Sequence, residues 1–159
     1  MDPRLGTLER GTELELYRLL RRLERNPAEL TDELLLAVTR FALERLWWLH
    51  AMWSGRELDR SPFPPGGEAN WMDVRGWAMM ALNVLSAIEP SLGRFPLNIP
   101  DPLIETHWRR VGDLTAEDFD HAPGARGVVE EAIQRLSTAA IPIISTAAKE
   151  TQMAIRQDA

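Results

Sequence analysis

One segment, residues 33–53, constrains the fold of this chain more than any other, because its apolar side chains recur with the period of an α-helix. These apolar positions form a single helical stripe: Leu35, Val38, Ala42, Leu46, Leu49 and Trp53. Charged side chains mark the opposite, solvated face: Glu33, Arg40 and Glu44. Trp47 and Trp48 lie on the continuation of that solvated face. The helix is therefore amphipathic at its start and apolar nearly all round at its end, and something has to cover its second half.

The helical period extends to most of the chain, and no segment shows the alternation of a β-strand. The pattern predicts main helices over residues 5–25, 31–54, 71–89 and 124–157, and a short one over 103–110. Pro142 lies inside the last of these, so a kink or break is expected one turn before it. Two proline-rich loops, 56–70 and 90–102, separate the helices. We therefore expect an all-α fold: a four-to-five-helix bundle with two long proline-rich loops and a kinked C-terminal helix, in a single helical domain over residues 1–159.

Composition excludes several kinds of site. The 159 residues include no cysteine, so disulfides, thiolate metal ligands and cysteine nucleophiles are excluded. The net charge of −6 argues against broad, non-specific binding of nucleic acid, which requires clustered bases. Glycine-rich phosphate loops are missing, and we expect no cofactor. Neither a secretory leader pattern nor an apolar run of membrane-spanning length occurs. We therefore expect a cytoplasmic protein that does not act at a membrane.

Four arginines in the first predicted helix share one face. Arg18, Arg21, Arg22 and Arg25 follow the three- and four-residue spacing of neighbours on a helix. Such a stripe could bind phosphate groups or an acidic partner. The alternative is that these arginines favour the negative end of the helix dipole and pair with Glu24 and Glu29.

Two further constellations could carry chemistry. Arg45 and His50 form an Arg-x4-His pattern that is similar to the active-site motif of the metal-free helical ribonucleases, which would imply RNA cleavage. Helical geometry places these two side chains about 140° apart, on opposite sides of the apolar stripe. An acidic cluster near residue 120 holds carboxylates and an imidazole that could ligate a divalent metal: Asp113, Glu117, Asp118, Asp120 and His121. The alternative is a solvated acidic loop, and we predict neither a catalytic residue nor a metal site.

The sequence favours a non-enzymatic interaction protein, a small subunit or adaptor of a larger protein assembly. Its partner would be another protein or a second copy of itself. The candidate partner-binding residues are Trp47, Trp48, His50, Arg18, Arg21, Arg22 and Arg25. One alternative is a small helical subunit of a nucleoprotein complex, like those of CRISPR effectors, that contacts phosphate through the four arginines. Another is a helical ribonuclease or metal-dependent hydrolase. Trp47 and Trp48 could instead be covered by the two proline-rich loops.

Overall fold

The computed structural model describes residues 2–53, 71–95, 97 and 125–157, and the regular structure in these residues is helical throughout. The elements follow in the order α1 (Pro3–Arg10), α2 (Glu13–Arg25), the 3-10 turn η1 (Pro27–Glu29), α3 (Asp32–Trp53), α4 (Trp71–Ile88), the 3-10 turn η3 (Pro90–Leu92), α5 (Ala125–Ser137) and α6 (Pro142–Gln157). The all-α class and a helical bundle are therefore confirmed. The expected loop 56–70 and the short helix 103–110 lie outside the described residues.

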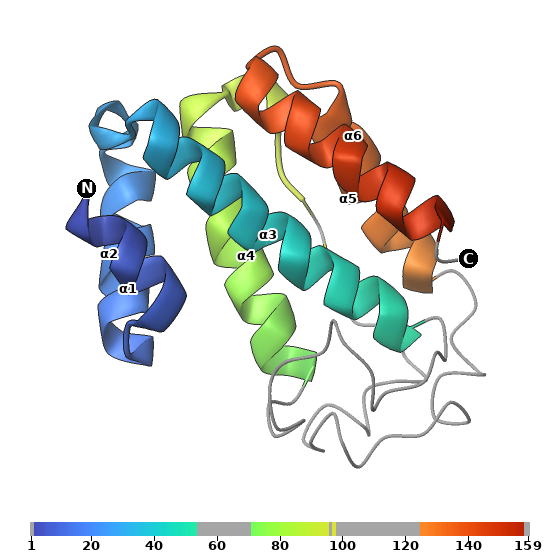
Figure 1. Ribbon diagram of the computed structural model, residues 1–159, viewed down its shortest axis with the longest axis horizontal. Helices are drawn as coiled ribbons and strands as arrows, with labels where there is room; N and C mark the ends of the chain where they lie inside the picture. Colours follow the sequence, from blue (N-terminus) through green and yellow to red (C-terminus); the bar gives the residue numbers. More distant parts are fainter. Residues whose placement is uncertain (1, 54–70, 96, 98–124, 158–159) are drawn as a thin grey trace.

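Helix α3 is the centre of the bundle. It packs against α4, α5, α6 and α1, whereas α2 packs mainly on α4. Figure 1 shows α1 and α2 at one end of the molecule and the α5–α6 pair at the other, with α3 and α4 between them. The side chains that join these layers are fully buried, among them Leu46 and Leu49 of α3, Leu82 and Leu85 of α4, and Ile133 of α5. Five members of the predicted core stripe of α3 are buried: Leu35, Val38, Ala42, Leu46 and Leu49.

The first predicted helix is two helices, because the chain breaks at Gly11 and Thr12. Gly11 ends α1 in an extended conformation, and its backbone N–H donates to the carbonyl of Thr7. The Thr12 hydroxyl then accepts a hydrogen bond from the backbone N–H of Glu15 at 3.2 Å and caps α2. A hydroxyl at the N-cap satisfies one of the free N–H groups of the first turn, so Thr12-x-x-Glu15 restarts the helix.

The C-terminal helical segment is interrupted completely rather than kinked. Residues 138–141 form a turn, and α6 packs back along α5 as the second arm of a helical hairpin (Figure 1). Pro142 occupies the first position of α6, where a missing N–H is harmless and the fixed φ suits the helix. The Glu89 carboxylate, which is buried, accepts hydrogen bonds from the backbone N–H groups of Ala140 and Ile141 at 3.0 and 2.7 Å. A side chain from the end of α4 therefore caps the start of α6.

The chain that follows α4 is fixed to two helices by arginines. Phe95 and Leu97 are buried. Arg75 of α4 donates from Nε to the carbonyl of Leu97. Arg135 of α5 donates to the carbonyl of Arg94, and its guanidinium lies 5.0 Å from the centre of the Phe95 ring. These contacts hold Arg94, Phe95 and Leu97 against α4 and α5.

Candidate functional site

Helix α2 presents apolar side chains to solvent, directly opposite its core side. Its buried residues are leucines on one face: Leu16, Leu19, Leu20 and Leu23. At 100° per residue, five other side chains fall within about 100° of each other on the opposite side. We call these the outer face of α2: Leu14, Tyr17, Arg18, Arg21 and Arg25. Leu14 is 56% exposed and Tyr17 is 49% exposed. Two large apolar side chains thus stand where a surface helix ordinarily carries only polar ones.

The four arginines predicted to bind a partner are not equivalent. Arg21 forms an ion pair with Glu24 at 3.3 Å, and Arg22 forms one with Glu29 at 2.7 Å. The hydrogen bonds from Arg22 lower the pKa of Glu29 below its ordinary value. In the part of the chain that the structure describes, Arg18 and Arg25 have no carboxylate partner. Two of the four arginines, Arg21 and Arg22, are therefore paired with carboxylates. The other two, Arg18 and Arg25, both lie on the outer face of α2.

The two tryptophans at the end of α3 are covered to different degrees. Trp48 is 9% exposed and belongs to the core, whereas Trp47 is half-buried. The indole N–H groups of both are buried, and neither donates to an acceptor within the described residues. The Arg45 guanidinium lies 3.3 Å from the centre of the Phe41 ring and 5.0 Å from that of Trp48. Stacking on an arginine thus accounts for part of the enclosure of Trp48.

Arg45 and His50 do not converge on one site. Arg45 donates to the carbonyl of Phe41 within its own helix and lines a surface hollow between α1 and α3. His50 is buried and points to α5, where its Nε2 lies 2.9 Å from Oε1 of Glu130. The two side chains therefore lie on different sides of α3, as the helical period of the sequence predicts. Within one copy of the chain, they do not form a ribonuclease-like pair.

The acidic cluster at 113–121 lies outside the described residues. Within the parts of the chain that are described, no group of three or more acidic or histidine side chains is arranged to hold a metal ion. The described helices also include none whose length and hydropathy would allow it to span a bilayer.

Sequence reasoning missed Leu14 and Tyr17, although the sequence contains the signal for them. When the helix is drawn with its ordinary period, Leu14 lies about 170° and Tyr17 about 110° from the centre of the leucine stripe. An apolar residue on the charged side of a strongly amphipathic helix is the observation that would have identified this surface.

Comparisons of this chain with known proteins find no significant match. The chain matches no known family, and neither a curated protein nor a solved structure is significantly similar to it.

Proposed function

We propose that this protein is a non-enzymatic helical interaction module, and that the outer face of α2 binds another protein. The observation that carries this proposal is the exposure of Leu14 and Tyr17 beside Arg18 and Arg25, which have no carboxylate partner among the described residues. Tyrosine and arginine are enriched at the centres of protein interfaces, where they supply contact area and hydrogen bonds.

The partner would present apolar and acidic side chains together, for example along one face of an amphipathic helix. Leu14 and Tyr17 occupy the first half of the outer face of α2, and arginines occupy the second half. An apolar stripe that continues into carboxylates would bury the first half and pair with Arg18 and Arg25 in the second. A second copy fits less well, because an identical outer face has no carboxylate to pair with Arg18 and Arg25. Nucleic acid also fits less well, because Leu14 offers nothing to a phosphate backbone and Arg21 and Arg22 are already paired.

The proposal can be tested by placing a photo-crosslinking amino acid at Tyr17. Irradiation in an extract of the source cells should attach one protein, which mass spectrometry identifies and which is then purified and titrated against the unmodified chain. We expect Leu14→Ala, Tyr17→Ala and Arg18→Glu each to weaken that binding about tenfold or more, equivalent to about 1.4 kcal/mol. Because these side chains are exposed, their replacement should change the free energy of unfolding by less than about 0.5 kcal/mol.

Met153 provides the matched control, because it lies on α6 and is 57% exposed, like Leu14. A crosslinker at Met153 should not capture the same protein, and Met153→Ala should leave its affinity unchanged. Three results would contradict the proposal: affinity that is insensitive to all three outer-face variants, capture of a second copy alone, or capture of nucleic acid alone.

A further inference from the structure

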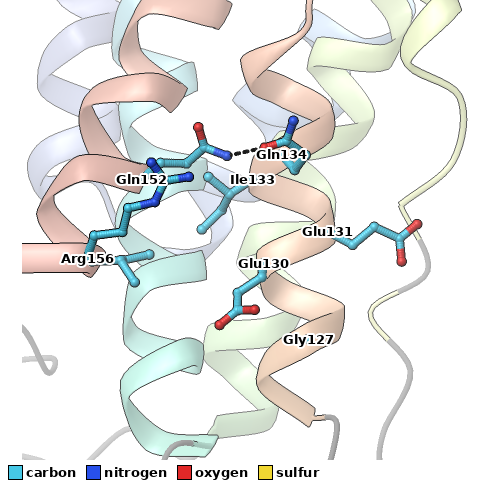
Figure 2. A pocket seen from close by; sticks show the side chains of 8 residues that line it. Gly127, Glu130, Glu131, Ile133, Gln134, Gln152 and Arg156 are labelled. Atoms are coloured by element: carbon cyan, nitrogen blue, oxygen red, sulfur yellow. Dashed lines mark hydrogen bonds between the residues drawn. The ribbon is translucent and has the colours of Figure 1, made fainter. Parts of the chain in front are cut away.

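A pocket of about 490 Å³ lies between α5 and α6, away from the outer face of α2. Its volume falls in the range of roughly 300 to 1,000 Å³ that is usual for small-molecule sites. Ile133 and Ile155 supply apolar walls, and side chains from both helices face the space with polar groups (Figure 2). Among the residues that the structure describes, those that line the pocket all belong to α5 and α6.

Two amides in the pocket hold each other and keep free hydrogen-bonding atoms. Gln152 of α6 donates from Nε2 to Oε1 of Gln134 of α5, at 2.6 Å. Figure 2 shows this bond bridging α5 and α6. Because an amide carries two N–H donors and one carbonyl acceptor, Gln134 still offers its N–H groups and Gln152 still offers its carbonyl oxygen. The amide pair therefore presents donors and an acceptor in a fixed arrangement.

Opposite charges line the same pocket without pairing with each other. Glu130 projects from α5, and one of its oxygens is held by the ring of the buried His50 at 2.9 Å. Arg156 projects from α6 and forms no ion pair within the described residues. A guanidinium binds a carboxylate through two parallel hydrogen bonds, and a carboxylate such as Glu130 accepts from an ammonium group. The pocket thus offers complementary partners for both ends of a dipolar molecule.

We propose that this pocket binds a small zwitterion, an α-amino acid with an apolar side chain. The ligand carboxylate would pair with Arg156 and accept from the Gln134 amide. Its ammonium group would donate to Glu130 and to the carbonyl of Gln152. Its side chain would pack on Ile133 and Ile155, the apolar walls of the pocket.

The test uses the whole chain and the standard L-amino acids as individual probes at millimolar concentration. Side-chain amide signals of glutamine in ¹⁵N NMR spectra report binding, and calorimetry supplies the dissociation constant. We expect at least one apolar amino acid to bind and to shift two glutamine amides. Butyrate and butylamine, which carry only one of the two charges, should bind at least about tenfold more weakly. If none of the amino acids binds, or if butyrate binds as tightly as an amino acid, the proposal is wrong.

Three variants connect binding to this pocket. Arg156→Gln and Glu130→Gln should each weaken binding about tenfold or more, because each removes one charge pair. Gly127→Leu should block binding by occupying the space, and it should fold, since a Cβ added at Gly127 meets no atom within 4 Å. Lys149→Gln is the matched control, because Lys149 is an exposed cation of α6 that does not line the pocket. Equal affinity of all four variants would show that the ligand binds elsewhere and would overturn the assignment.

Discussion

At the scale of single residues, Glu89 caps the start of α6 although it lies far from that helix in the sequence. Its carboxylate satisfies two backbone N–H groups just ahead of a helix that begins more than fifty residues later. The first N–H groups of a helix have no partner within it, and a carboxylate there also interacts favourably with the helix dipole. The charge of Glu89 is thereby compensated although the residue is only 7% exposed.

We predict that Glu89→Ala lowers the free energy of unfolding by about 2 to 3 kcal/mol, because two backbone N–H groups at the start of α6 lose a charged acceptor. Glu89→Gln should cost about half as much, since one carbonyl oxygen remains. Urea unfolding followed by circular dichroism measures both changes. Glu150→Ala, which removes an exposed carboxylate of α6, is the control and should cost less than about 0.5 kcal/mol. A loss for Glu89→Ala no larger than that of the control would contradict the role of the carboxylate as a cap.

Arg45 carries the most perturbed charge in the described residues. Burial lowers its pKa to about 10, and the Glu44 carboxylate at 3.7 Å offsets only part of that effect. The unfolded chain should keep the higher pKa that is ordinary for an arginine. Between these two values the unfolded state binds more protons than the folded state, so the folded state gains stability as the pH rises.

We predict that the wild-type chain gains about 1 kcal/mol per pH unit relative to Arg45→Met between about pH 10 and 12. Below about pH 9 the difference between the two should be constant. Paired urea titrations at several pH values measure this difference, and the subtraction removes the contribution of every other titrating group. A difference that stays flat or falls above pH 10 would show that the folded state keeps Arg45 fully charged.

At the scale of elements, the break between α1 and α2 and the break before α6 have different causes. The break between α1 and α2 is local, because Gly11, Thr12 and Glu15 form it within five residues. The sequence therefore contained the information, and a Thr-x-x-Glu capping pattern inside an apolar period was the signal. The break before α6 depends partly on Pro142, which the sequence revealed, and partly on Glu89, which no local pattern connects to residue 141. A kink and a complete reversal are therefore indistinguishable from the sequence.

Small side chains set how closely α6 approaches its neighbours. Ala148 is fully buried where α6 packs on α3 and α5, whereas Lys149, the next residue, is exposed. We predict that Ala148→Leu lowers the free energy of unfolding by about 1 to 3 kcal/mol, because the added atoms force the helices apart. Lys149→Leu should change it by less than about 0.5 kcal/mol. Thermal and urea unfolding of the two variants provide the comparison, and equal effects would place the helix contact elsewhere.

At the scale of the whole molecule, the helical class and the core followed from periodicity, whereas the surfaces with functional interest did not. Leu46 and Leu49 repeat with the helical period and are buried, so the pattern was sufficient for them. The pairing of His50 with Glu130 and the amide bridge from Gln134 to Gln152 join separate helices. Such contacts depend on how the helices pack, and a helical period alone contains no information about that arrangement.

The central position of α3 makes a prediction about cooperativity. Because α3 contacts helices at both ends of the molecule, we expect one unfolding transition, as for a single domain. Tryptophan fluorescence reports mainly on α3 and α4, which contain five of the six tryptophans, while circular dichroism reports on every helix. The two urea curves should coincide, and Leu46→Ala should shift both equally, by about 2 to 5 kcal/mol. An earlier transition in circular dichroism would show that α1 and α2 unfold separately.

The long-range cap of α6 also has a consequence for the order of events in folding. Joining Glu89 to Ile141, 52 residues away, closes a loop whose entropic cost is about 3 to 4 kcal/mol, whereas α5 and α6 meet through a short turn. The hairpin should therefore form before the carboxylate reaches its N–H groups, which leaves the cap unmade in the transition state. Removal of the Glu89 carboxylate should then accelerate unfolding and leave the folding rate nearly unchanged.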